Sequence, residues 1–137
     1  VKVRDIASGK IFRILNTHLD HISDEARILG VRQILNRVCD VTDEDNIPFI
    51  LGGDFNAKPE SDTIKYCNGF DRIKIFDITK DIDVTFHNWG NRSAKIDYIY
   101  VTSDLKDRVR SVCVWDDEVY GMYLSDHYPV CAQFAME

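Results

Sequence analysis

The sequence predicts a single domain of mixed α/β class. Short apolar runs alternate with polar residues, and one stretch repeats its apolar residues at helical spacing. The order of predicted elements is mixed: a hairpin, a helix, a strand, a short helix and then mostly strands. The 137 residues are 45% hydrophobic and 29% charged, the composition of a globular domain with its own core. No internal repeat or linker divides the chain, so we expect one folding unit.

The first half of the chain is expected to hold a hairpin over 1–15, a helix over 24–39 and a buried strand over 47–51. Residues 1–6 and 11–15 alternate around a glycine turn, as hairpin strands do. Ser23 can cap the helix, and Ile28, Val31, Leu35 and Val38 fall on one stripe. An acidic loop over 40–46 follows the helix, and Gly52-Gly53 is expected to end the strand.

The second half is expected to be mostly strands. We predict a short helix from Ser61 to Cys67, strands over 70–76, 95–101, 108–115 and 128–134, and irregular segments over 77–91 and 116–126. Irregular segments of this length inside a compact domain are usually functional or mobile.

Charge and cysteine content exclude several classes of protein. A net charge of -6 does not provide the long-range attraction expected of a protein that grips many nucleic-acid phosphates, although it suits a site that holds a divalent cation. The four cysteines form no Cys-x-x-Cys pair, which excludes a zinc ribbon or a thioredoxin-like site. We read them as free thiols and expect a cytoplasmic location. No stretch is long enough for a membrane span.

Polar residues recur in four places at the ends of predicted strands. They are Asn16 with His18, Asp54 with Asn56, Asp97, and Ser125 with Asp126 and His127. Each group alone also suits a turn, a cap or an outward-facing position. At the end of a strand in an α/β sheet, however, a carboxylate beside an amide suits a metal with its bound phosphate.

Asp97 strengthens the case for a functional site, because it stands inside an apolar run. A carboxylate whose side faces the interior needs a partner, and a histidine is a natural one. An aspartate that accepts from one imidazole nitrogen fixes the tautomer and leaves the other nitrogen for a substrate or water.

Four ordered motifs carry a resemblance to a known family. They are Asn-Thr-His-Leu-Asp-His at 16–21, Gly-Gly-Asp-Phe-Asn at 52–56, Lys-Ile-Asp-Tyr-Ile at 95–99 and Ser-Asp-His-Tyr-Pro-Val at 125–130. In order and rough spacing they resemble the endonuclease/exonuclease/phosphatase superfamily, whose members are DNase I-like. The resemblance implies a two-sheet α/β sandwich flanked by helices that hydrolyses phosphate esters with Mg²⁺ or Mn²⁺.

The resemblance also implies residue roles. Asp126 would be a metal ligand, Asp54 would position or deprotonate the attacking water, and Asp97 would pair with His127, which faces the phosphate. His18 and Asn56 would hydrogen-bond phosphate oxygens. Three further residues would lie on the substrate side of the site: Asn16, Arg27, and His87 in the segment 85–89. Asn16 would support the other groups. Arg27 also suits a solvated helix face, and the aromatic residues around His87 could stack on a base, touch lipid or simply cover the core.

The chain also departs from the family pattern, because nothing before residue 16 resembles the family's metal-binding glutamate motif. Residues 1–137 therefore resemble the C-terminal portion of one such domain, without its N-terminal portion. We expect the isolated fragment to be inactive and to bind Mg²⁺ weakly. Because the strand over 128–134 would lack its usual neighbour, we also expect the fragment to self-associate or to depend on the missing N-terminal half.

The predicted function is a divalent-metal-dependent phosphoesterase that cleaves a phosphodiester by in-line attack of water. A nuclease is favoured on the breadth of the family alone, with nucleic acid as substrate and a lipid or sugar phosphate as the alternative. Two other readings stay open. The chain could be a phospholipid or inositol phosphate phosphoesterase, or a non-catalytic interaction domain that keeps the family fold.

Overall fold

The structure is a computed structural model that describes residues 1–116 and 119–136. In chain order the elements are β1 (Lys2–Arg4), β2 (Ile11–His18), α1 (Asp24–Asp45), β3 (Phe49–Asp54), α2 (Asp62–Asn68), β4 (Ile75–Asp77), β5 (Asp97–Thr102), α3 (Ser103–Lys106), β6 (Val109–Val114) and β7 (Val130–Phe134). The predicted mixed α/β class is confirmed.

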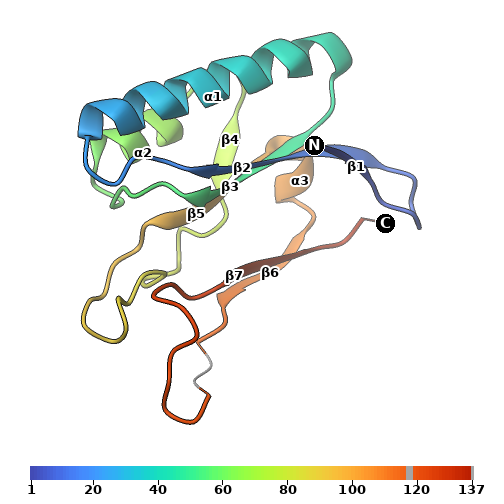
Figure 1. The fold of residues 1–137 in the computed structure, drawn as a ribbon. Coiled ribbons are helices and arrows are strands. Elements are labelled where there is room, and N and C mark those ends of the chain that lie inside the picture. The colour runs from blue at the N-terminus through green and yellow to red at the C-terminus, as the bar shows by residue number, and fades with distance from the viewer. Residues whose placement is uncertain (117–118, 137) are drawn as a thin grey trace.

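The strands form a five-stranded sheet of order β1-β2-β3-β5-β4 and a separate two-stranded sheet of β6 and β7. In Figure 1, α1 lies along one side of the larger sheet, and β6 and β7 lie on its other side. β2 and β3 are parallel, and β3 and β5 are antiparallel. The parallel pair is connected through α1, which packs back onto the sheet as such crossovers do.

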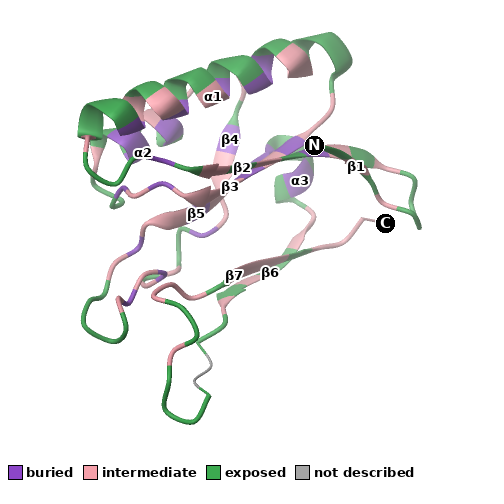
Figure 2. Ribbon diagram, in the orientation of Figure 1, coloured by how far each residue is buried: buried purple, intermediate pink, exposed green. Residues whose placement is uncertain are grey.

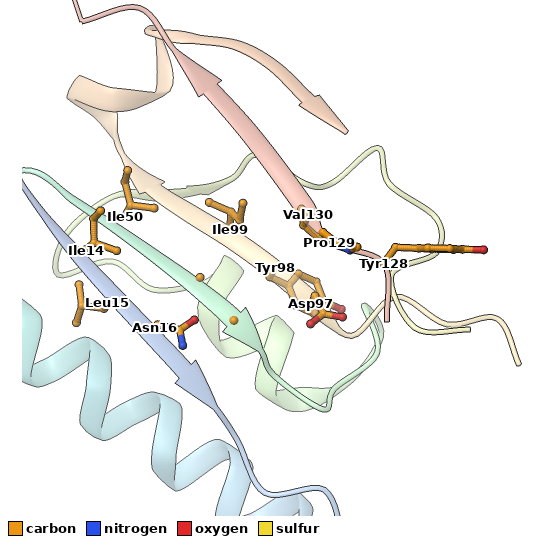
Figure 3. Close-up of a pocket in the computed structure, with 12 residues that line it drawn as sticks. Ile14, Leu15, Asn16, Ile50, Asp97, Tyr98, Ile99, Tyr128, Pro129 and Val130 are labelled. Atoms are coloured by element: carbon orange, nitrogen blue, oxygen red, sulfur yellow. The ribbon is translucent and has the colours of Figure 1, made fainter. Parts of the chain in front are cut away.

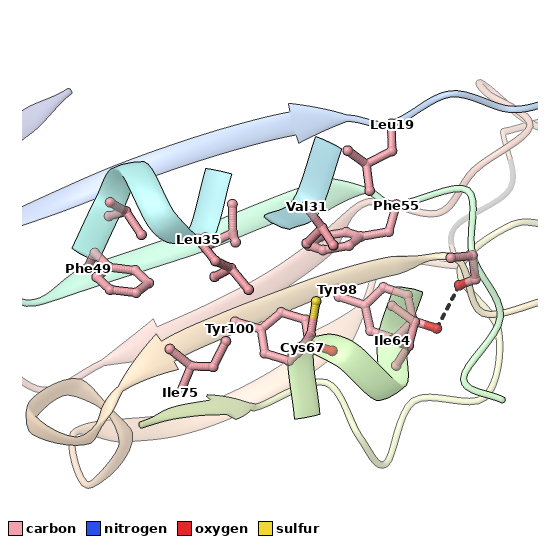
Figure 4. Packing of buried hydrophobic residues seen from close by; sticks show 13 residues of the cluster. Leu19, Val31, Leu35, Phe49, Phe55, Ile64, Cys67, Ile75, Tyr98 and Tyr100 are labelled. Carbon is pink, nitrogen blue, oxygen red and sulfur yellow. Dashed lines mark hydrogen bonds between the residues drawn. The ribbon is translucent and has the colours of Figure 1, made fainter. Parts of the chain in front are cut away.

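The core lies between the helices and one face of the larger sheet. Val31 and Leu35 of α1 are fully buried against strand residues that include Phe49 and Tyr100 (Figure 4). Burying a side chain of this size contributes roughly 1.5–3 kcal/mol. The same helix is exposed along its outer side (Figure 2). The helical stripe predicted from the sequence is therefore the face that α1 buries.

Helix α1 runs through the acidic loop predicted over 40–46, so that prediction is wrong. Ser23 caps its first turn, as expected, by accepting from the Ala26 backbone N–H. Near its other end, Arg72 lies 2.8 Å from a carboxylate oxygen of Asp40 and of Asp43, which offsets their mutual repulsion. The sequence pattern alone did not show this cation, because it comes from a segment about thirty residues away in the chain.

Other predicted boundaries also change. Strand β3 continues through the glycines to Asp54 because both neighbouring strands pair with it there. The strand predicted over 70–76 shrinks to β4 at 75–77, since only these residues reach the edge of β5. The segment over 103–106 forms the unpredicted α3. The irregular segment predicted over 116–126 includes residues 117–118, which lie outside the described residues.

The other face of the larger sheet carries apolar side chains that none of the described helices covers. A cavity of about 350 Å³ on this face is lined by residues that include Ile14, Ile50, Ile99 and Val130 (Figure 3). Ile14 is 36% exposed. In the part of the chain that the structure describes, no helix has the length and apolar character of a membrane span.

Gly53 is the position where β2 and β3 come closest. Its φ is +140°, and a Cβ at this position would lie 1.9 Å from the carbonyl oxygen of Thr17. Only glycine has no such atom, so the close approach of the two strands depends on it.

We expect Gly53→Ala to lower the free energy of unfolding by at least about 2 kcal/mol, because the strands must separate or the backbone must refold locally. Gly52→Ala is the matched control, since a Cβ there meets the nearest atom at 3.5 Å, an ordinary contact. Urea denaturation of the full natural chain measures both. Equal midpoints for the two variants would show that the β2–β3 contact does not limit stability.

Candidate active site

The site forms where three strands of the larger sheet reach one edge. The register places His18 of β2 beside Asp54 of β3, and Asp54 beside Asp97 of β5. Three of the predicted residues are thus brought together by strand pairing alone. They open onto a cavity of about 980 Å³, lined by His18, His21, Asp54, Asn56, Lys58, Phe86, Arg92, Ser93, Ala94, Ile96, Asp97, Asp126 and His127.

Asp97 and His127 form the pair that the sequence predicted. His127 Nδ1 lies 2.9 Å from Asp97 Oδ2, and because a carboxylate can only accept, the imidazole donates from Nδ1. The ring of Phe86 packs against the imidazole, with 4.8 Å between the ring centroids. Asp97 therefore fixes the tautomer in which Nε2 is free to face the cavity.

Asp54 is the carboxylate at the centre of the site. Its Oδ2 lies 3.4 Å from His18 Nε2 and 3.8 Å from His127 Nε2. Burial raises the pKa of Asp54 above its ordinary value, and the neighbouring Asp97 carboxylate adds to the rise. The Asn56 backbone N–H and the two histidines oppose it. Asp54 is thus a crowded carboxylate with a raised proton affinity.

Asn56 is held in a constrained conformation beside Asp54. Its φ is +49°, in the left-handed region that asparagine tolerates better than most residues. Its backbone N–H donates to Asp54 Oδ1 over 2.7 Å, and its side-chain Nδ2 donates to the Leu19 carbonyl over 2.9 Å. Asn56 thus ties the end of β3 to the segment that follows β2.

Thr85 holds the two halves of the Asp97–His127 pair in place. The sequence pointed to the segment 85–89 that contains Thr85 but did not predict this role. Its hydroxyl accepts from the backbone N–H groups of Ile96 and Asp97, each over 3.0 Å. Its carbonyl accepts from the Tyr128 N–H over 2.8 Å. The side chain is fully buried. Only its place in a polar, irregular segment before the Asp97 motif could have suggested a role.

The donors at this site fit a divalent cation of the Mg²⁺ or Mn²⁺ type. Among the described residues, one group of carboxylate and imidazole ligands has its atoms within 4.8 Å of one another, namely Asp54, Asp97 and His127. Two crowded carboxylates, one with a raised pKa, are what a bound cation would relieve. Asp126, the predicted metal ligand, lines the same cavity but does not belong to that group.

Asn16 lies close to the site but not in the main cavity. It lines the adjoining cavity on the open face of the sheet, which shares Asp97 with the main one (Figure 3). The supporting role that the motif implied for Asn16 stays a prediction.

The structure does not bring Arg27 or His87 to the cavity wall. Arg27 is buried at the start of α1, where it donates to the Asp20 carbonyl over 2.8 Å and pairs with Asp24. His87 is 4% exposed and lies against the rings of Tyr123 and Tyr128, with centroids 4.3 and 4.2 Å away. Both residues hold the backbone near the site, and neither lines the cavity.

Three basic residues of the cavity wall were not predicted from the sequence. His21, Lys58 and Arg92 line it together with the predicted groups. Lys58 follows the Asp54–Asn56 motif by two residues, and His21 ends the first motif, so their spacing offered a signal. Arg92 offered none, because its position depends on how the segment before β5 folds back.

Fold and site together define a DNase I-like α/β protein, with a His–Asp pair and a central carboxylate at one edge of the sheet. The chain belongs to the Endonuclease/Exonuclease/phosphatase family, whose model matches residues 4–127. The resemblance inferred from the four motifs is therefore confirmed.

Solved structures with the same fold include a conserved protein from Enterococcus faecalis, with 29% identity over 99% of this chain and 54% of that one and a TM-score of 0.83. An endonuclease/exonuclease/phosphatase from Bacteroides vulgatus has 29% identity over 99% and 54% of the two chains, with a TM-score of 0.82. A mannosyl-6-phosphatase from Bacteroides thetaiotaomicron has 24% identity over 96% and 54%, with a TM-score of 0.83. The chain thus spans about half the length of these proteins. No curated protein sequence matches it.

We expect Asp54→Asn to raise the melting temperature at neutral pH. Because the pKa of Asp54 is raised in the folded protein, the folded state binds this proton more tightly than the unfolded state does. The stability that results is complete below the ordinary pKa of aspartate and is lost as the pH rises through the folded pKa. Replacing the carboxylate removes that loss, and the gain should shrink as the pH falls to about 4, near the ordinary pKa of aspartate.

Thermal unfolding of the full natural chain, with EDTA to remove metal, measures this difference. Asp83→Asn is the matched control, because Asp83 is exposed and lies outside the cavity. A melting temperature that falls at neutral pH in Asp54→Asn would contradict the assignment of Asp54 as a destabilising buried charge.

Proposed function

We propose that the natural protein containing residues 1–137 is a divalent-metal-dependent phosphoesterase that hydrolyses a phosphodiester, with nucleic acid as the favoured substrate. The observation that carries the proposal is the Asp97–His127 hydrogen bond of 2.9 Å, set beside the Asp54 carboxylate in one cavity. An imidazole held by a carboxylate, with a second carboxylate beside it, offers the groups that in-line attack of water on a phosphate needs.

In this mechanism Asp54 orients the water and accepts its proton. His127, held by Asp97, presents Nε2 to the phosphoryl group, where a protonated imidazole stabilises the charge that develops on oxygen. In the same mechanism His18 and Asn56 donate to the other phosphoryl oxygens, and their place in the wall of this cavity supports that role.

Asp126 and Asp54 are the carboxylates that would hold Mg²⁺ or Mn²⁺ on this chain. When bound, the cation would neutralise phosphate charge and polarise the ester toward attack. Carboxylate oxygens are the ligands that these hard cations prefer. The carboxylates of Asp54, Asp97 and Asp126 line one cavity, which supports a cation at this edge of the sheet.

A phosphomonoesterase acting on a sugar phosphate is the second candidate. One protein with the same fold is a mannosyl-6-phosphatase, so this fold serves a phosphatase as well as the nucleases that the family description names. The family and its folds support phosphoester hydrolysis in general. A non-catalytic interaction domain is less well supported, because Asp54, Asp97 and His127 all line one cavity.

We also propose a cytoplasmic location, on the cysteine pattern alone. Each of the four cysteines is a free thiol in the structure. The location stays a prediction.

Hydrolysis of bis(4-nitrophenyl) phosphate by the full natural protein, with and without Mn²⁺, tests the proposed activity. We expect a metal-dependent rate that falls roughly 100-fold or more in His127→Ala, because general acid–base groups contribute factors of this size. Asp97→Asn should also lose activity, since the imidazole loses its orienting carboxylate.

Asp83→Asn serves as the control, and its rate should equal that of the unaltered protein. Full activity in His127→Ala would refute the site assignment. Removal of the metal with EDTA should abolish the rate in the unaltered protein, and a rate that survives EDTA would refute the role of the cation.

We further propose that residues 1–137 form the C-terminal portion of one family domain, and that the rest of that domain covers the open face of the larger sheet. Ile14, Ile50 and Ile99 line the cavity on that face. This chain covers 54% of each of two matched proteins, so the remaining part of a protein of that length could supply the covering segment.

Purified residues 1–137 alone should therefore self-associate through this face, since an uncovered apolar surface seeks a partner. Sedimentation velocity should show a dimer or larger species that Ile14→Lys shifts toward monomer. Ile22→Lys is the control, because Ile22 is 79% exposed and lies outside this cavity. A monodisperse monomer of the unaltered fragment would contradict the proposal.

A further inference from the structure

The cavity wall carries two basic side chains beside the carboxylates of Asp54, Asp97 and Asp126. The net charge is -6, yet Lys58 and Arg92 both line the cavity that holds Asp54 and His127. Many other basic side chains lie within 4 Å of a carboxylate, namely Lys2, Arg13, Arg27, Lys65, Arg72, Lys80 and Lys95. Among the described residues, Lys58 and Arg92 have no such carboxylate. Their charges remain available to an anionic ligand.

Lys58 projects from a rigid part of the backbone. The preceding Ala57 is 3% exposed, and its carbonyl accepts from the Tyr98 hydroxyl over 2.8 Å. The Lys58 carbonyl accepts from the Ser61 N–H over 2.9 Å, at the start of α2. The base of the Lys58 side chain is therefore held by the core, and only its flexible end needs to be ordered when an anion binds.

Arg92 projects from a loop that is closed on itself and fastened to the site. Phe86 and Ala94 form a bridge at its base, and the Arg92 N–H donates to the His87 carbonyl over 2.9 Å. The His87 N–H donates in turn to the carbonyl of Asp126 over 2.9 Å. The loop that carries Arg92 is thus bound directly to the segment that carries His127.

His87 completes this anchor. Its buried ring lies between Tyr123 and Tyr128, and its Nδ1 accepts from the Gly90 N–H over 3.3 Å. The structure therefore holds the Arg92 backbone at a defined position on the cavity wall.

We propose that Lys58 and Arg92 form a second phosphate subsite, and that the substrate is a phosphate ester that carries a further phosphate group. This inference rests on the proposed function, in which Asp54 and His127 act on the reacting phosphate. An arginine guanidinium offers a planar fork of donors, and a lysine ammonium offers a compact charge, so the two together suit a phosphate dianion. The cavity of about 980 Å³ exceeds what a single phosphate fills.

Two matched chromogenic substrates test the subsite: thymidine 5′-(4-nitrophenyl phosphate), with and without a phosphate on the 3′ oxygen. The full natural protein, assayed with Mn²⁺, should show a lower KM for the 3′-phosphorylated compound. In Lys58→Met and in Arg92→Gln, this KM should rise about tenfold or more, the effect of losing a charged hydrogen bond. The KM for the compound without the 3′ phosphate, and kcat for both, should stay within about twofold, since the reacting phosphate keeps its contacts.

Lys80→Met and Arg37→Gln are the matched controls, because both residues are exposed and lie outside the cavity. They should change neither KM. If the two cavity variants weaken both substrates equally, the cations act on the reacting phosphate and the second subsite is refuted.

A binding experiment separates failure of the subsite from failure of the proposed function. Calorimetric titration of the same proteins with thymidine 3′,5′-bisphosphate and with thymidine 5′-monophosphate requires no turnover. Tighter binding of the bisphosphate that is lost in Lys58→Met and Arg92→Gln supports the subsite even if neither substrate is hydrolysed. Equal binding of the two nucleotides by the unaltered protein overturns it, whatever the hydrolysis assay shows.

Discussion

The site depends on the pairing of β3 with a strand on each side. This register places His18, Asp54 and Asp97 in a row at one edge of the sheet. Because side chains alternate along a strand, a slip of one residue in either pairing would turn one of these groups to the opposite face. The close approach of β2 to β3 exists only because Gly53 has no Cβ to meet Thr17. One glycine in the sheet therefore underlies the chemistry at its edge.

The same arrangement forces carboxylates together. Burial raises the pKa of Asp54, and the neighbouring Asp97 carboxylate adds to the rise. Structures tolerate such crowding where it serves a purpose, since perturbed carboxylates cluster at functional sites. Here the histidines and the Asn56 N–H offset part of the repulsion, and a bound cation would offset more. Stability and activity are thus opposed at Asp54, as they often are at catalytic positions.

The segment between β4 and β5 joins the two sheets at the site. Thr85 binds the start of β5 through its hydroxyl and the residue after His127 through its carbonyl. His87 and its loop attach to Asp126 and to the aromatic rings around it. Asp97 belongs to β5 and His127 to the segment before β7, so this connection holds together the two parts of the chain that form their hydrogen bond. The long irregular segment is a structural part of the site, and the same loop also carries the charge of Arg92 to the cavity.

Local pattern in the sequence was enough to predict the hairpin, the helix with its Ser23 cap, the short helix capped by Ser61 and the main strands, because spacing and capping are properties of neighbouring residues. The four motifs were enough to identify the family and to bring His18, Asp54, Asn56, Asp97, Asp126 and His127 to one cavity wall. Contacts between distant segments decided the rest. Arg72 pairs with acidic residues of α1 beyond its predicted end, His87 packs against tyrosine rings and not into the cavity, and Lys58 and Arg92 line one cavity. Such placements depend on which surfaces pack together, and no local spacing in one sequence records them.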